Sequence, residues 1–134
     1  MAQTVLITGA SNGIGKACAR VFARKGYDLV LVARHREKLE AVKAELSEYD
    51  VHIKVVVMDL TGEDAAVDLY NNLVLDDISI DILVNNAGFG DHGAFHDSSW
   101  EKQKKMVLLN IMALMQMTYV FGQSMKRRKK GRIL

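Results

Sequence analysis

Residues 8–15 read TGASNGIG and form the part of the sequence with the clearest chemical potential. They follow a short apolar run at residues 4–8 and precede a helical pattern, so the glycines stand in a strand-to-helix turn. Because glycine has no Cβ, the backbone can turn tightly there and approach a large anion. The free N–H groups of the following helix attract negative charge. This context predicts a site for the pyrophosphate of a dinucleotide.

Three other interpretations of this turn compete with that prediction. A P-loop needs its second glycine five positions after the first and a hydroxyl after its lysine, whereas Gly15 lies six positions after Gly9 and Ala17 follows Lys16. The common GxGxxG fingerprint is also absent, because the order here is GxxxGxG, a different member of the same physical class. A purely structural glycine turn remains the third alternative, and the strand and helix on either side make it the less favoured one.

Apolar runs alternate with amphipathic patterns along the rest of the chain. We expect strands at residues 4–8, 28–33, 52–58 and 81–84, and helices from the glycine turn to Gly26 and at residues 36–47 and 61–75. The strands are continuous apolar runs, so both of their faces must be covered. The sequence therefore predicts the α/β class, as a doubly wound Rossmann-type parallel sheet with helices on both faces.

The last third of the chain predicts one long helix. Ser98 and Glu101 form a capping-box pattern at its start. One apolar face runs along it at spacings of three and four, through Val107, Ile111, Leu114, Thr118, Phe121 and Met125. A basic run at residues 126–130 ends the helix, as suits the negative end of its dipole. Residues 132–134 then resemble an opening strand, so we expect a sheet truncated after the start of its fifth strand.

The end of the second strand bears on the choice of nicotinamide cofactor. Sites for NAD place an acid there to bind the ribose 2′-hydroxyl, whereas sites for NADP lack the acid and carry a cation for the 2′-phosphate. Here Ala33 occupies the position of the acid, and Arg34 follows it directly, with His35 and Arg36 adding positive character. The sequence favours NADP, with NAD as the alternative.

Further polar residues follow the later strands. Asn85, Asn86, Ala87 and Gly88 end the fourth strand, Asp59 and Leu60 follow the third, and Asn110 lies within the long helix. Together with the TGxxxGxG turn, this ordered set resembles the short-chain dehydrogenase/reductase family over the whole chain. The resemblance implies hydride transfer between a nicotinamide and a carbonyl or alcohol substrate.

The resemblance also implies a role for each residue. The pyrophosphate would lie against Gly9, Gly13 and Gly15, with Ser11, Asn12 and Ile14 nearby. Asp59 and Leu60 would contact the adenine, and Asn86, Ala87 and Gly88 the adenine ribose. Asn110 would be the catalytic asparagine that organises a proton-relay water.

Simpler explanations exist for three of these positions. Asn85 and Asn86 could be turn residues, because asparagine tolerates unusual backbone angles. Asp59 could cap the next helix. Asn110 could be a hydrogen-bonded polar group of the core.

The tyrosine and lysine that the resemblance would supply for proton transfer are missing. The chain has four tyrosines, and the residues four positions after them are Leu31, Ile53, Val74 and Gln123. We therefore expect residues 1–134 to be one incomplete NAD(P)-binding domain that is inactive alone. A nucleotide-binding module without catalysis is the alternative function.

Composition narrows the class of protein. The chain has 134 residues, 49% of them hydrophobic, with a net charge of +2, which is too small to indicate a nucleic-acid partner. One cysteine among 134 residues excludes an internal disulfide and fits a cytoplasmic location. We expect no membrane span, because no apolar run appears long enough to cross a bilayer. His92 and His96 fit a surface loop better than a metal site. The uncovered apolar surface of the cut-short sheet favours a homo-oligomer.

Overall fold

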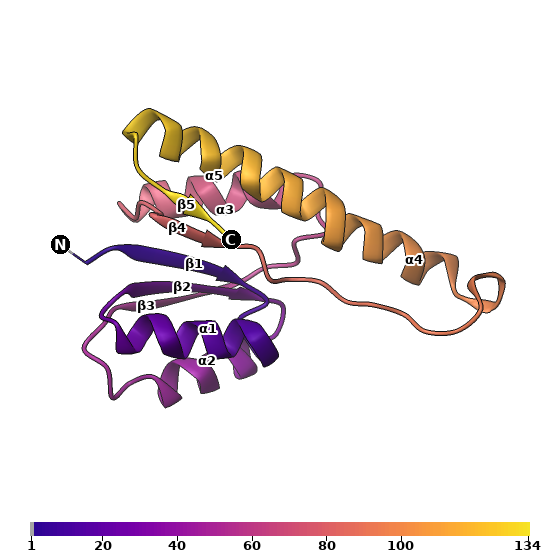
Figure 1. The fold of residues 1–134 in the computed structure, drawn as a ribbon, viewed down its shortest axis with the longest axis horizontal. Coiled ribbons are helices and arrows are strands. Elements are labelled where there is room, and N and C mark those ends of the chain that lie inside the picture. Colours follow the sequence, from indigo (N-terminus) through magenta and orange to yellow (C-terminus); the bar gives the residue numbers. More distant parts are fainter. Residues whose placement is uncertain (1) are drawn as a thin grey trace.

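The computed structural model describes residues 2–134 and shows one parallel sheet with helices on both of its faces (Figure 1). The strands lie in the order β3-β2-β1-β4-β5, and every pair is parallel. Their bounds are Thr4–Thr8 (β1), Asp28–Ala33 (β2), Ile53–Val57 (β3), Ile82–Val84 (β4) and Arg132–Ile133 (β5). The predicted fold class is therefore confirmed.

The helices connect successive strands. Their bounds are Gly13–Arg24 (α1), Arg36–Glu45 (α2), Ala65–Leu75 (α3), Trp100–Val107 (α4) and Leu114–Arg128 (α5). A π-helical segment, η2 (Leu108–Ala113), joins α4 to α5, and a short 3₁₀ turn, η1 (Phe95–Asp97), precedes α4. In Figure 1, α1 and α2 cover one face of the sheet, and α3 and α5 cover the other.

Each face of the sheet has its own hydrophobic core, because successive strand residues point to opposite sides. From β1, Val5 and Ile7 join the core under α1 and α2, whereas Leu6 joins the core under α3 and α5. All three side chains are completely buried. This double burial explains why the strands are apolar at every position.

The strand order reverses at β1. The chain runs from β1 outward to β3, then crosses back to place β4 on the other side of β1. The loops that leave the carboxyl ends of β1 and β4 therefore part in opposite directions. In open parallel sheets, ligands bind in the crevice at such a reversal.

Some predicted boundaries were wrong for local reasons. Helix α3 begins at Ala65 rather than at residue 61, because Thr61 is held in a turn where both its N–H and its hydroxyl donate to the Asp59 carboxylate. The predicted capping box was also wrong. Ser99 is the N-cap of α4 and accepts from the Lys102 N–H, whereas the Ser98 hydroxyl donates to the Phe95 carbonyl.

The apolar face predicted for the long helix was wrong over most of its length. The side chains of this helix that are buried against the sheet are Ala113, Met117, Phe121 and Met125. Only the last two were predicted. Val107 and Ile111 lie before or within the π-helical turn of η2, which shifts the helical phase, and beyond it the buried residues recur at every fourth position instead of at alternating spacings of three and four. Six exposed apolar side chains of this helix form what we call the outer apolar band, made of Val107, Ile111, Met112, Leu114, Met115 and Tyr119.

The expectation that no apolar run reaches the length of a membrane span was wrong as well. The continuous helix Trp100–Arg128 is long and apolar enough to cross a bilayer by length and composition. Only 17% of its most apolar stretch is buried. The helix nevertheless packs on the sheet and on α3, where the Gln116 side chain accepts from the Ala66 N–H and donates to the Glu63 carbonyl.

Candidate nucleotide-binding site

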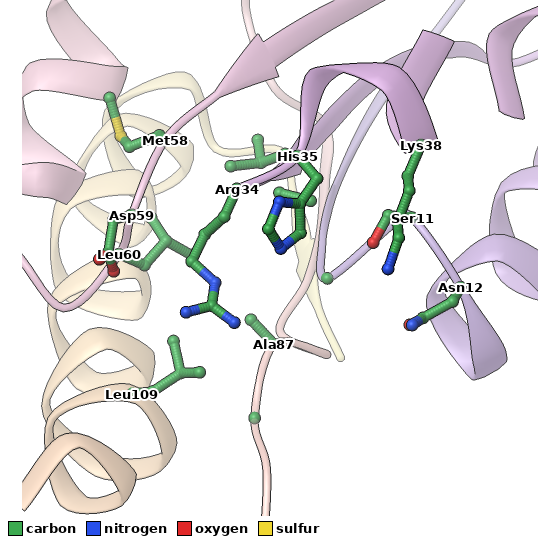
Figure 2. A pocket seen from close by; sticks show the side chains of 14 residues that line it. Ser11, Asn12, Arg34, His35, Lys38, Met58, Asp59, Leu60, Ala87 and Leu109 are labelled. Carbon is green, nitrogen blue, oxygen red and sulfur yellow. The ribbon is translucent and has the colours of Figure 1, made fainter. Parts of the chain in front are cut away.

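A cavity of about 230 Å³ opens at the carboxyl ends of β1, β2 and β4, where the strand order reverses (Figure 2). Most residues that the sequence assigned to a cofactor line this cavity, namely Gly9, Ser11, Asn12, Arg34, Asp59, Leu60, Ala87 and Gly88. The structure thus brings together residues from four separate loops. Its other lining residues are Val32, Ala33, His35, Lys38, Met58 and Leu109.

The glycine turn contains two kinds of glycine. Gly9 and Gly13 have φ angles of +63° and +53°, in the left-handed region that other residues adopt only with strain. Gly15 is required for space instead, because a Cβ there would lie 2.3 Å from the Gly9 carbonyl oxygen and 2.6 Å from Asn86 Nδ2. Gly13, Gly15 and Ile14 do not line the cavity, and Ile14 is 74% exposed.

A buried hydroxyl joins the ends of β1 and β4. Thr8 Oγ1 accepts from the Asn86 and Ala87 N–H groups, at 2.9 Å each, and donates to the Val84 carbonyl at 3.3 Å. The Asn86 side chain also donates to the Gly9 carbonyl at 3.1 Å. Asn86 therefore acts here by fixing the glycine turn against the loop after β4, and it does not itself line the cavity.

The side of the cavity formed by β2 and α2 is cationic. Figure 2 shows Arg34, His35 and Lys38 extending from this segment toward the cavity, with Ser11 and Asn12 on the side of the glycine turn. No acid stands at the end of β2, where Ala33 lies. Asp59 is the only carboxylate that lines the cavity within residues 2–134.

Asp59 lies at the end of the cavity formed after β3. Hydrogen bonds from the side chain and backbone of Thr61 hold the pKa of the Asp59 carboxyl below its usual value, and the positive charges of Arg34 and Lys105 act in the same direction. Asp59 does not cap α3, whose N-cap position is Asp64. An ionised, preorganised carboxylate beside an apolar wall formed by Leu60 and Leu109 suits the amino group of a purine.

Asn110 lies in η2 and fastens the loop after β4 to the helix. Its Oδ1 accepts from the Phe89 N–H at 3.0 Å, and its Nδ2 donates to the Phe89 carbonyl at 2.8 Å. A Cβ at Gly88 would lie 2.9 Å from the same Oδ1. The side chain of Asn110 is therefore engaged with the backbone next to the cavity, and π-helical segments of this kind are frequent at functional sites.

This geometry agrees with the comparison to known families. A family model described as short chain dehydrogenase matches residues 3–134. The chain belongs to the short-chain dehydrogenase family. The resemblance inferred from the turn, the asparagines and Asp59 is thus confirmed at the level of the family.

Individual relatives within the short-chain dehydrogenase family are similarly close. The chain is 36% identical to a very-long-chain 3-oxoacyl-CoA reductase of Phaeosphaeria nodorum over 96% of its own length and 39% of the relative. It is 37% identical to a 17-beta-hydroxysteroid dehydrogenase type 3 of Mus musculus over 100% of its own length and 44% of that relative. The chain thus spans less than half the length of both proteins.

Two solved structures with the same fold are complexes with a nicotinamide cofactor. A short-chain dehydrogenase from Sphingobium yanoikuyae in complex with NADPH is 38% identical, with a TM-score of 0.89 over 98% of this chain and 52% of that one. A metagenomic short-chain oxidoreductase in complex with NADP has a TM-score of 0.92 at 32% identity, over 98% of this chain and 60% of that one.

The sequence did not identify Lys38, Met58 and Leu109 as lining residues. Met58 and Leu109 are apolar and carry no chemical signal of their own. Lys38 did carry a signal, because it is charged and lies seven residues before Glu45, on the same side of α2. A search for the element that this side faces would have pointed to α1.

Proposed function

We propose that this chain forms the cofactor-binding part of an NADP-dependent oxidoreductase that transfers hydride between the nicotinamide and a carbonyl or alcohol substrate. The single observation that carries the proposal is the cavity at the reversal of strand order, with the glycine turn on one side and the Arg34 cation in place of an acid on the other. The relatives with NADPH and NADP in their structures support the same cofactor.

Each side of the cavity would hold one part of the dinucleotide. The N–H groups that open α1 would bind the pyrophosphate, beside Gly9, whose left-handed backbone lets the chain turn there. Asp59, Leu60 and Leu109 would enclose the adenine, and Arg34 would pair with the 2′-phosphate through two hydrogen bonds. Ala87 and Gly88 would face the ribose. When bound, the nicotinamide supplies or accepts the hydride.

Asn110 would contribute to the proton pathway through position rather than by direct transfer. Its side chain is committed to the Phe89 backbone, so its effect on a relay water would come through the local geometry of η2. None of the four tyrosines has a lysine four residues later, and the exposed Tyr119 lies on the outer apolar band. We therefore propose that the 134-residue chain binds the cofactor without turning over substrate.

The second candidate function is a nucleotide-binding module without catalysis. The two candidates share the site described above and differ in the residues that accompany it. A carbonyl or alcohol substrate is supported by the names of the relatives, a 3-oxoacyl-CoA reductase and a hydroxysteroid dehydrogenase. We further propose a homo-oligomer, because the outer apolar band is a large exposed apolar surface. A cytoplasmic location stays a prediction.

Titration of the chain with NADPH and with NADH tests the cofactor proposal. We expect NADPH to bind at least about tenfold more tightly, since one paired phosphate adds about 1.4 kcal/mol or more. The variant Ala33→Asp restores the acid at the end of β2 and should reverse the preference. Equal binding of both cofactors, or no binding of either, would refute the proposal. Ketone reduction by the same preparation would refute the proposal that the 134-residue chain binds the cofactor without turnover.

A further inference from the structure

We propose that Lys38 is a second cation for the 2′-phosphate and a determinant of NADP specificity alongside Arg34. The proposal rests on the proposed function, since it concerns the same cavity. Lys38 lines that cavity together with Ser11, Asn12 and Arg34 (Figure 2). The end of β2 therefore supplies one cation, and the first turn of α2 supplies another.

The packing of α2 fixes the direction in which Lys38 points. Leu39 and Val42 are buried in the core under α1 and α2, so the rotation of α2 about its axis is set. Glu45 lies two turns after Lys38 on the same side of the helix. The Glu45 carboxylate meets Lys16 at 2.9 Å and Arg20 at 3.3 Å, which shows that this side of α2 faces α1. Lys38 consequently faces the beginning of α1, where the glycine turn lies.

The charge of Lys38 is free to meet a ligand. Within residues 2–134, no carboxylate lies within ion-pair distance of Lys38 or Arg34, whereas Arg36 pairs with Glu40 at 3.7 Å. Lys38 thus has no ion-pair partner in the described part of the chain, and Arg34 has only the Asp59 carboxylate, at more than ion-pair distance. Two cations on one cavity repel each other, and a dianion bound between them would relieve that repulsion.

The two side chains would recognise the phosphate differently. The planar guanidinium of Arg34 can bind two oxygens at once or stack on the adenine ring, whereas the Lys38 ammonium is a compact point charge. If Arg34 covers the adenine, Lys38 becomes the main partner of the phosphate. Ser11 lines the same cavity and can donate its hydroxyl to a third oxygen.

Calorimetric titration of the 134-residue chain with two adenosine ligands tests this proposal. Adenosine 2′,5′-bisphosphate carries the phosphate in question, and adenosine 5′-monophosphate lacks it. We expect Lys38→Ala to weaken binding of the bisphosphate about tenfold and binding of the monophosphate less than about twofold. Lys38→Arg should retain most of the affinity. Arg36→Ala removes the same charge from the same helix turn, outside the cavity lining, and should leave both affinities unchanged.

The outcomes separate this inference from the proposed function. If Arg34→Ala discriminates between the two ligands and Lys38→Ala does not, the role of Lys38 is refuted and the NADP proposal stands. Equal weakening of both ligands by Lys38→Ala would refute it too, because a general field or a folding defect would then be responsible. If the unmodified chain binds the two ligands equally, both the inference and the preference for NADP fail.

Discussion

The two faces of the sheet are covered by helices that differ in how much of their apolar surface they bury. On one face, α2 buries its apolar residues Leu39 and Val42, and its salt bridges join it to α1. On the other face, α5 buries Met117, Phe121 and Met125, while the outer apolar band remains exposed. The comparison shows that the buried side of a helix is hard to predict when the helix has more apolar residues than its contact with the sheet requires.

The nucleotide cavity depends mainly on the part of the sheet that α1 and α2 cover. The glycine turn and the cationic residues belong to the β1-α1-β2-α2 unit, where backbone conformation leaves little freedom. The loop after β4 completes the cavity, and the hydrogen bonds of Asn86 with Thr8 and Gly9 hold this loop in place. The following predictions test how strictly each face depends on single residues, from the largest expected effect to the smallest.

The largest effect is expected at Gly15. Gly15→Ala places a Cβ against the backbone carbonyl of Gly9 and the side chain of Asn86. Because both groups would have to move, the free energy of unfolding should fall by about 4 kcal/mol or more. Gly13→Ala is the matched control. It meets open space and suffers only backbone strain, so it should lose about 1 kcal/mol. Urea unfolding curves measure both, and equal losses would show that space at Gly15 is not limiting.

The second effect separates the buried and exposed sides of α5. Phe121 is 2% exposed and packs edge-on against Tyr70, so Phe121→Ala should lower the free energy of unfolding by about 3 kcal/mol. Ile111 is 51% exposed in the single chain, so Ile111→Ala should change the free energy of unfolding by less than about 0.5 kcal/mol in solutions too dilute for self-association. The sequence placed both residues on one face. The proposed homo-oligomer would bury the outer apolar band, so the loss from Ile111→Ala should grow with protein concentration, and a loss that stays small at every concentration would count against it.

The third effect concerns the junction of β1 and β4. Thr8→Val keeps the shape of the side chain but leaves the Asn86 and Ala87 N–H groups without their acceptor, at a cost of about 2 kcal/mol. Thr8→Ser keeps the hydroxyl and should lose less. Hydrogen exchange at residues 86 and 87 should accelerate in Thr8→Val alone. Unchanged exchange would show that the hydroxyl does not hold this loop.

The smallest effect is a pH dependence at the opposite end of the sheet. Burial raises the pKa of the Asp81 carboxyl, but the Thr4 N–H and the Arg128 and Lys130 cations outweigh it and hold the pKa below its usual value. The charged form is thus favoured by folding. Its contribution to stability should be present above the ordinary carboxyl pKa of about 4 and be lost as the pH falls through the lowered pKa.

Comparison of Asp81→Asn with the unmodified chain checks this expectation. The variant should be less stable at pH 7, and the two unfolding free energies should converge as the solution is acidified. A difference that persists unchanged at about pH 2 would assign the effect to shape rather than to charge.

The sequence was sufficient for the parts in which backbone geometry dictates residue type. Strands β1 and β2 were predicted to the residue, because continuous apolar runs and a glycine turn allow few alternatives. Asp59 and Arg34 were placed correctly at strand ends that one sheet edge must bring together. Lys38 was missed because its direction depends on the packing of α2 against α1. The apolar face of the long helix was missed because the spacing of apolar residues does not reveal the π-helical turn of η2, which depends on tertiary packing.

The central position of β1 has a consequence for the order of events during synthesis. β1 is made before the other strands of this sheet, and it can pair with β2 as soon as β2 has been made, after which β2 can pair with β3. Its other edge must wait for β4, and the Thr8 hydroxyl meets Asn86 across 78 residues of chain. Contacts so distant along the chain close slowly, because the entropy of a long loop is lost before they form. A nascent chain would thus carry the glycine turn, not yet fixed by Asn86, well before it carried a site able to retain a nucleotide.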